Sequence, residues 1–143
     1  MGDRECDFYD FYTIAEGYIS GGKPYADWIV RGTWNRETET KDADESTIRK
    51  EVGAEEVIAT VEFMMASREG KPARLVQQEI KVKRVKVKPP KNKESEGVES
   101  IFITALLTSE KNTPDGCEPV GWLLLTCIDV ITAEDALNIV QWY

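Results

Sequence analysis

The acidic segment near the N-terminus carries the side chains of this chain that could take part in metal-dependent chemistry. Asp3-Arg4-Glu5-Cys6-Asp7 brings three carboxylates together within five residues. The sequence contains no histidine, which excludes Ser-His-Asp triads, Cys-His nucleophiles and His-ligated zinc. Any metal chemistry must therefore use carboxylate oxygens, and these ligands favour a hard cation such as Mg²⁺ or Mn²⁺.

A structural role is the alternative for the same carboxylates. Asp3 lies at or just before the start of a helical pattern, where a carboxylate can cap the helix and is favoured by its dipole. Asp7 lies one turn further along, and we expect it to be a solvated carboxylate of the first turn.

Length and composition indicate a single globular domain with a hydrophobic core. The chain has 143 residues, of which 41% are hydrophobic. No apolar run approaches the ~18 residues of a membrane span, and no signal peptide precedes the first charges, so we expect no membrane partner. Cys6, Cys117 and Cys127 are odd in number and lack a paired metal-ligand spacing. They are expected to be reduced, small and buried, as in a cytoplasmic protein.

The charge of the chain is unevenly distributed. The net charge is -8, and residues 1–60 hold 14 Asp and Glu against 7 Lys and Arg. Residues 68–93 reverse this balance, with 10 Lys and Arg against 2 Glu. Contact with a polyanion such as DNA needs only one basic face, so the net charge does not exclude nucleic acid.

The N-terminal third predicts one helix and one short strand. Apolar residues recur at helical spacing from Cys6 to about Ile19, and the Gly-Gly-Lys-Pro run at residues 21–24 ends the helix. Residues 28–31 indicate a short buried strand. Trp28 and Trp34 are expected in the core.

The middle of the chain predicts a polar linker followed by an antiparallel sheet. Residues 35–53 are heavily charged without an apolar period, which is typical of a loop. Alternating runs at 57–65, 75–88 and 101–108 indicate strands, separated by turns at 68–72 and 91–96. The alternation in the second run changes phase at Lys83 and Arg84, which predicts a β-bulge there.

The last segment changes character. Val120 to Cys127 is almost entirely apolar, which favours a strand buried on both faces of a mixed or parallel sheet. Thr132 to Asp135 has the pattern of a capping box, and the apolar spacing after it predicts a helix that reaches Tyr143. We expect residues 3–34 and 119–143 to pack together, and residues 54–108 to form a separate twisted sheet.

Taken in order, these segments resemble a known family. Asp3-Arg4-Glu5-Cys6-Asp7 is similar to the Asp-Arg-Glu-Xaa-Asp motif of bacterial insertion-sequence transposases of the IS-four type, which are DDE enzymes with an RNase H-like core. Trp122 to Thr126 resembles their Trp-Leu-Leu-Leu-Thr strand, which follows a β-rich insertion. Tyr143 matches the first residue of their Tyr-x-x-Arg-x-x-x-Glu-x-x-x-x-x-x-Lys signature.

The resemblance implies a mixed α+β fold with a divided core. Residues 1–34 and 119–143 would form a partial RNase H-like core of two strands and two helices. Residues 35–118 would be a linker and an inserted twisted antiparallel sheet. The first catalytic Asp would lie upstream of this segment, and the Arg, Glu and Lys of the last signature downstream.

The same resemblance implies cut-and-paste DNA transposition by the intact enzyme, through metal-dependent cleavage and strand transfer. Asp3 would be a catalytic carboxylate and a ligand of a two-metal Mg²⁺ or Mn²⁺ site. A single such carboxylate is expected to bind Mg²⁺ weakly and to leave this segment inactive alone. Trp122 would stack a flipped DNA base, Arg31 would hold DNA, and Tyr143 would contact phosphate. The partner would be transposon-end DNA, with a homodimer in the intact complex and a monomeric segment.

The basic strand 81–88 is a second candidate DNA contact. Five cations alternate there with valines, and most of them are expected to project from one face; they are Lys81, Lys83, Arg84, Lys86 and Lys88. Lys83 and Arg84 are the members expected to meet phosphates, although such a row can also be a solvated face that protects an edge strand. The alternative function is therefore a stand-alone β-rich module whose basic ribbon binds an acidic partner.

Overall fold

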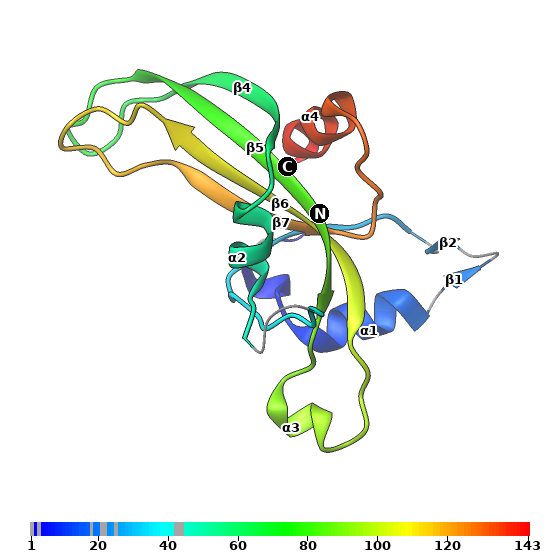
Figure 1. Cartoon of the computed structure of the whole chain (residues 1–143). Helices are drawn as coiled ribbons and strands as arrows, with labels where there is room; N and C mark the ends of the chain where they lie inside the picture. Colours follow the sequence, from blue (N-terminus) through cyan, green and yellow to red (C-terminus); the bar gives the residue numbers. More distant parts are fainter. Residues whose placement is uncertain (1, 3, 18, 21–22, 25, 42–44) are drawn as a thin grey trace.

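A computed structural model of the chain describes residues 2, 4–17, 19–20, 23–24, 26–41 and 45–143 (Figure 1). These residues form a mixed α+β fold with a five-stranded antiparallel sheet and four α-helices. In chain order the elements are a 3₁₀ turn Arg4–Cys6, α1 Tyr9–Gly17, β1 Ile19–Ser20, β2 Lys23–Pro24, β3 Ile29–Arg31, α2 Ile48–Gly53, β4 Val57–Met65, β5 Arg74–Val87, α3 Lys91–Glu94, β6 Ile101–Lys111, β7 Gly121–Thr126 and α4 Ala133–Trp142.

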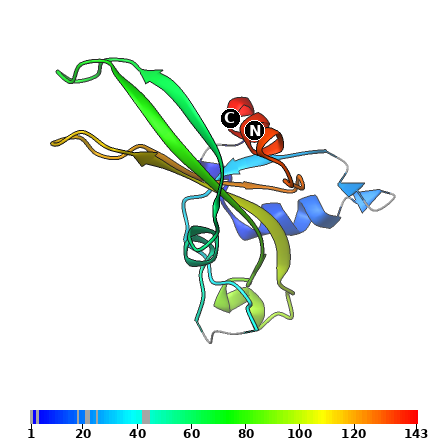
Figure 2. The ribbon, with the colours of Figure 1, turned by 45° about the horizontal axis from the view of Figure 1, so that its top comes forward.

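The large sheet has the strand order β3-β7-β6-β5-β4, and each neighbouring pair is antiparallel. β1 and β2 form a separate two-stranded ribbon. Gly2 extends the large sheet beyond β3 through a parallel bridge to Val30. The sheet is strongly twisted, so that the β4–β5 hairpin and the β6–β7 connection diverge as two arms (Figure 2).

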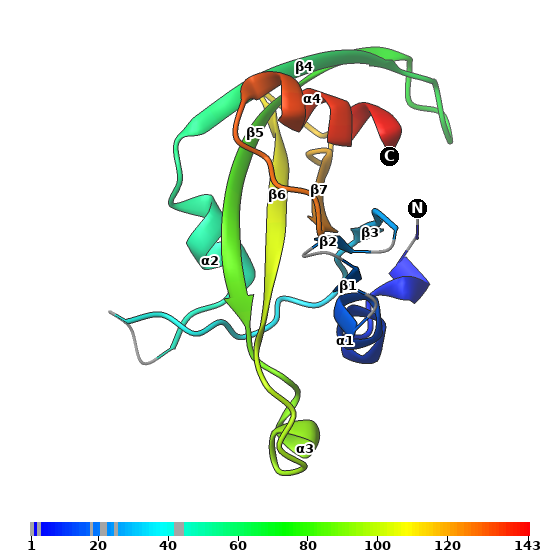
Figure 3. The ribbon, with the colours of Figure 1, turned by 90° about the vertical axis from the view of Figure 1, so that its right-hand side faces the viewer.

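Two hydrophobic clusters cover the two faces of the sheet. On the first face, which we call the α1/α2 face, side chains of α1 and α2 pack on Val85, Ile103 and Leu123. On the second, the α4 face, Ala136 and Ile139 of α4 pack on Ile80, Leu106 and Leu124. Figure 3 shows α4 crossing the strands at one end of the sheet. The sheet is thus the middle layer, covered by helices over different parts of its length.

Local sequence signals explain the two capped helices. Thr132 caps α4 by accepting a hydrogen bond from the Asp135 amide, and the Asp135 carboxylate accepts one from the Thr132 amide. This is the predicted capping box. The hydrogen bond from the Thr132 amide is the main cause that lowers the pKa of the Asp135 carboxyl. Thr47 caps α2 by accepting a hydrogen bond from the Lys50 amide.

β7 corrects one expectation about the sheet. Its Leu123, Leu124 and Leu125 are buried, which confirms a strand covered on both faces. The sheet is antiparallel, however, because β7 runs antiparallel to both of its neighbours, β3 and β6. β7 pairs with β3 as well as with β6, so residues 54–108 do not form a sheet of their own. The RNase H-like assignment remains a prediction.

The predicted bulge at Lys83 and Arg84 is also wrong. The β5–β6 register runs without interruption from Gln77↔Lys111 to Val87↔Ile101, and the irregularity lies in β4, between Val57 and Ala59. The apolar phase changes in β5 because the covered face changes along this long strand. Ile80 and Val82 meet the α4 cluster, whereas Val85 and Val87 meet the α1/α2 cluster.

Two further expectations differ from the structure. The segment 35–53 is not entirely loop, because Ile48 and Val52 are buried on one side of α2. Trp28 lies in the core as expected, but Trp34 is 63% exposed.

Within the described ranges, no helix is long and apolar enough to cross a membrane. The three cysteines are unbonded and partly buried.

Candidate nucleic-acid interface

A cleft of about 930 Å³ opens on the α4 face of the sheet, between the β4–β5 turn and the loop that leads into β7. Its walls come from the end of β4, the turn 66–72, the start of β5 and residues 116–122. Arg4 and Arg31 close one side of it. The cleft therefore joins segments from the beginning, middle and end of the chain.

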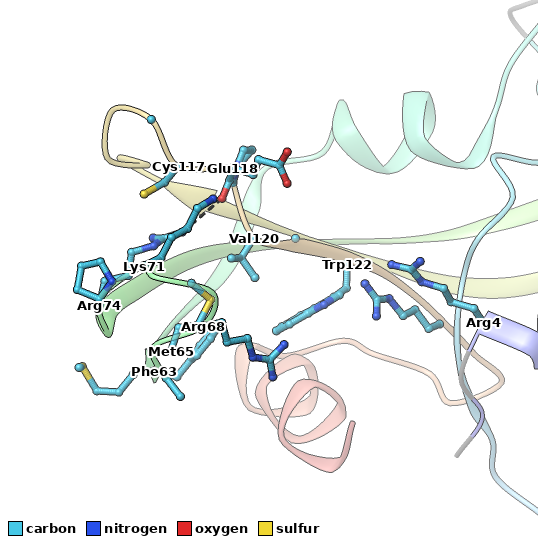
Figure 4. Close-up of a pocket in the computed structure, with 17 residues that line it drawn as sticks. Arg4, Phe63, Met65, Arg68, Lys71, Arg74, Cys117, Glu118, Val120 and Trp122 are labelled. Carbon is cyan, nitrogen blue, oxygen red and sulfur yellow. Dashed lines mark hydrogen bonds between the residues drawn. The ribbon is translucent and has the colours of Figure 1, made fainter.

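The described lining of the cleft is strongly basic. It carries five cationic side chains and a single acidic one; the cations are Arg4, Arg31, Arg68, Lys71 and Arg74, and the acid is Glu118. Figure 4 shows Trp122 between Arg4 on one side and Arg68, Phe63 and Met65 on the other. Cations around an aromatic ring are suited to a ligand that has both phosphates and planar bases.

Trp122 is held in place by its neighbours. Its amide donates to Thr108 Oγ1 at 2.9 Å. Its ring stacks on Phe63 with a centroid distance of 5.9 Å and an interplanar angle of 23°. Tyr143 approaches it in a tilted arrangement at 6.3 Å. Phe63 supports one face of the ring, which is what a stacking platform requires.

An ion pair fixes the far wall of the cleft. Arg74 makes a two-pronged contact with the carboxylate of Glu110, and it also donates to the Glu118 carbonyl at 3.3 Å. Glu110 accepts the Val120 amide at 2.8 Å. The hydrogen bond from Arg74, reinforced by that from Val120, lowers the pKa of the Glu110 carboxyl. β5 is thereby tied to the loop that precedes β7.

The structure brings together three of the residues predicted to contact DNA. Arg31 and Trp122 line the cleft, and Tyr143 lies against Trp122. Asp3 is outside the described residues. Its neighbour Gly2 accepts a hydrogen bond from the Arg31 amide and donates to the Ile29 carbonyl, which places Gly2 beside the backbone of Arg31. Among the described residues, no group of three or more His, Cys, Asp or Glu side chains could hold a metal ion.

Asp7 is not the solvated carboxylate that we expected. It is 3% exposed and accepts hydrogen bonds from the Thr33 and Trp34 amides and from the Tyr12 hydroxyl. Arg36 completes its shell with an ion pair at 2.9 Å. Burial, followed by the charge of Asp7, raises the pKa of Tyr12 well above its usual range. Both carboxylate oxygens of Asp7 are bound by other residues of the chain, so Asp7 has a structural role.

The basic ribbon is divided between two faces. Lys81 and Lys83 lie on the α1/α2 face, while Arg84, Lys86 and Lys88 lie on the α4 face. Lys83 pairs with Glu55 at 3.0 Å and with Glu51 at 3.6 Å. Its hydrogen bond to Glu55 raises the pKa of the Lys83 ammonium. Arg84 forms an ion pair with Asp129. The two central cations of the ribbon therefore cannot meet one ligand together.

Sequence reasoning missed several cleft residues. Arg68, Lys71 and Arg74 were visible only as part of the basic excess of residues 68–93, and their turn gave no indication of what they face. Phe63 was expected only as an alternating strand residue. Its ring stacks on Trp122, which is far away in the sequence, and no local pattern can predict such a contact.

Comparison with protein-family models finds no match for the chain. Comparison with curated protein sequences finds no significant relative either.

Proposed function

We propose that this chain supplies a DNA-contacting part of the catalytic domain of a DDE transposase. The observation that carries the proposal is that Arg31 and Trp122, picked out by the resemblance alone, line one basic cleft. They come from segments about ninety residues apart, yet both face the same space. This convergence supports a shared ligand.

The start of the chain supports the same proposal. Gly2 pairs in parallel with Val30, and Arg4 lines the cleft beside Arg31. Gly2 and Arg4, the described residues on either side of the first motif residue, thus lie at the sheet edge that borders the cleft. In the proposed enzyme this edge would bring bound DNA close to the motif.

The chemistry of the cleft follows from its residues. Arg4, Arg31 and Arg68 would contact phosphate oxygens, and the planar guanidinium can do so through two parallel hydrogen bonds. Trp122, supported by Phe63, would stack an unpaired base and offset the cost of removing it from the duplex. Bound divalent cations would supply the charge stabilisation for phosphodiester cleavage in the intact enzyme.

Titration with fluorescent DNA tests this proposal. The probe is a short duplex with unpaired nucleotides at one end, compared with a blunt duplex, and anisotropy is followed over a range of salt concentrations. We expect a Kd of about 10⁻⁴–10⁻⁶ M that weakens steeply with salt, since phosphate contacts release counterions. Trp122→Ala should cost about 1–3 kcal/mol on the unpaired probe and less on the blunt one.

Charge variants complete the test. Arg31→Ala should reduce the salt slope by about 1 on both probes. Lys83→Ala is the matched control, because it removes a cation that pairs with Glu51 and Glu55 on the opposite face. The proposal fails if Arg31→Ala and Lys83→Ala have the same effect, or if DNA binds no better than poly-glutamate. Preferential binding of poly-glutamate would favour the alternative module for an acidic partner.

A further inference from the structure

Phe102 is an exposed aromatic ring on the strand β6. It is 52% exposed, although it lies within the main sheet and its neighbours Ile101 and Ile103 are buried. The Lys86 ammonium lies 5.8 Å from the ring centroid, and the Arg84 guanidinium carbon lies 5.7 Å from it. A ring that is half exposed contributes little to the hydrophobic core. Its contact with two cations therefore calls for an explanation other than core packing.

Strand register places the three side chains on one face. Phe102 is directly opposite Lys86, and Arg84 is two residues along the same strand. This is the α4 face, which also carries the basic cleft. Ile80 and Val82, which meet the α4 cluster, separate Arg84 from Arg74 along β5. Arg74 and Lys86 are twelve residues apart, which corresponds to roughly 40 Å of strand.

Two exposed carboxylates hold the cations of this surface. Glu39 pairs with Lys86 at 2.8 Å, and Asp129 pairs with Arg84. The side chains of Glu39 and Asp129 are 44% and 70% exposed, so solvent screens both ion pairs. The hydrogen bond from Lys86, and after it that from Ser100, lowers the pKa of the Glu39 carboxyl. A ligand with its own anionic groups could take the place of these carboxylates.

We propose that Phe102, Arg84 and Lys86 form a second, independent contact surface for single-stranded nucleic acid, in which the ring stacks one base and the two cations take its flanking phosphates. Glu39 and Asp129 occupy the phosphate positions while the surface is free. Binding exchanges these ion pairs for contacts with phosphate, so the carboxylates weaken the affinity without blocking the site.

The exposed ring favours nucleic acid over an acidic peptide. Stacking on an aromatic side chain is available to every base and depends little on sequence. The carboxylates of an acidic peptide would bind only to the cations, and the Phe102 ring would remain exposed to solvent. The two ligand classes therefore differ in how strongly their binding depends on the ring.

The probe for this surface is a fluorescently labelled oligodeoxythymidine, titrated into the whole chain carrying Trp122→Ala, which removes the stacking ring of the cleft. In this background Phe102→Ala should weaken binding about 5- to 150-fold, which corresponds to the loss of one stacked base. Phe8→Ala is the matched control, because Phe8 is 49% exposed but lies beside α1, away from the cation pair. Glu39→Gln should strengthen binding about two- to fivefold, since it frees Lys86. Glu55→Gln, which removes one of the two acidic partners of Lys83 on the other face, should leave the affinity unchanged.

Backbone amide shifts in NMR spectra provide a readout that does not depend on substitution. Oligodeoxythymidine should shift the amides of Arg84, Lys86 and Phe102, and these shifts should persist in Trp122→Ala. The inference is overturned if Phe102→Ala behaves like Phe8→Ala, or if poly-glutamate binds equally well and is insensitive to Phe102→Ala. Loss of binding in Trp122→Ala together with no effect of Phe102→Ala would reject this surface and retain the cleft. The reverse pattern would retain this surface and reject the cleft.

Discussion

At the scale of single residues, Asp7 shows how a carboxylate of a suggestive motif can serve the fold. Its two oxygens accept bonds from two amides, a tyrosine hydroxyl and an arginine, which join the segment before α1 to residues 33–36. Burial of this charge is offset because every oxygen is partnered. The carboxylate is consequently unable to serve as an open metal ligand without dismantling these contacts.

Asp7→Asn tests this structural role. The amide keeps the shape of the side chain but removes the charge, and it leaves Arg36 without its anion in a largely buried position. Breaking one partner of such a pair should lower the free energy of unfolding by about 3–5 kcal/mol, measured by urea titration.

Asp10→Asn is the control for this prediction. Asp10 is close by, at the start of α1, but its partner is Lys93 and its side chain is 53% exposed. An exposed pair is worth about 0–1 kcal/mol, so Asp10→Asn should be nearly neutral. Equal effects of the two substitutions would show that the Asp7 shell contributes no more than a surface pair.

At the scale of elements, the cleft depends on how β5 is tied to the loop before β7. Arg74 and Glu110 form an ion pair between neighbouring strands. Arg74 reaches the loop by donating to the Glu118 carbonyl, and Glu110 by accepting from the Val120 amide. The side chain of Glu110 is 1% exposed. This clamp holds the cleft wall in place, and Arg74 is also one of the cations that line the cleft.

The lowered pKa of Glu110 predicts a pH dependence. A carboxyl whose pKa is lower in the folded state stabilises the fold above its unfolded pKa, and this contribution is lost as the pH falls through the folded value. The ordinary value is 4.5. Below about that pH, the wild-type chain should therefore lose unfolding free energy more steeply than Glu110→Gln, in which the clamp is already broken.

Urea titrations over a range of acidic pH measure this difference. Glu118→Gln is the matched control, because it removes an exposed carboxylate from the same loop and leaves the Arg74–Glu110 pair intact. It should retain the wild-type slope. Parallel curves for the wild-type chain and Glu110→Gln would contradict the assignment.

Local patterns predicted the elements better than their arrangement. The α4 capping box and the β4, β5 and β7 strands could be predicted because their signals lie within a few residues of one another. The division of the β5 cations between two faces was not predicted, because the change of apolar phase indicated a bulge. That change arises instead because α4 covers one half of the strand and the α1/α2 cluster the other. The Phe63–Trp122 stack and the Asp7–Arg36 pair likewise depend on long-range packing.

At the scale of the whole molecule, β7 is the junction of the sheet. It hydrogen-bonds β3 on one edge and β6 on the other, and its middle residues contribute to both hydrophobic clusters. The flanking segments and the central strands therefore share one sheet and contribute to both hydrophobic clusters. The cleft also includes residues from all these parts, so its shape depends on their staying together.

This arrangement predicts a single cooperative unfolding transition, which Leu125→Ala tests. Leu125 is fully buried and lies in register between Val30 and Ala105. Its truncation should cost about 2–5 kcal/mol, through lost burial and a residual cavity. Because β7 links the two parts, tryptophan fluorescence and far-UV circular dichroism should shift to the same lower urea midpoint.

Leu75→Ala is the control for the junction, since Leu75 is 54% exposed on β5 and should have little effect on either probe. Hydrogen exchange distinguishes the possible outcomes further. If the sheet is one unit, Leu125→Ala should accelerate exchange in β3 and β5 by similar factors, because both strands open in the same global event. Accelerated exchange in β3 with unchanged protection in β5 would instead show that the central strands fold independently of the flanking segments, and the cleft would then join two separately stable parts.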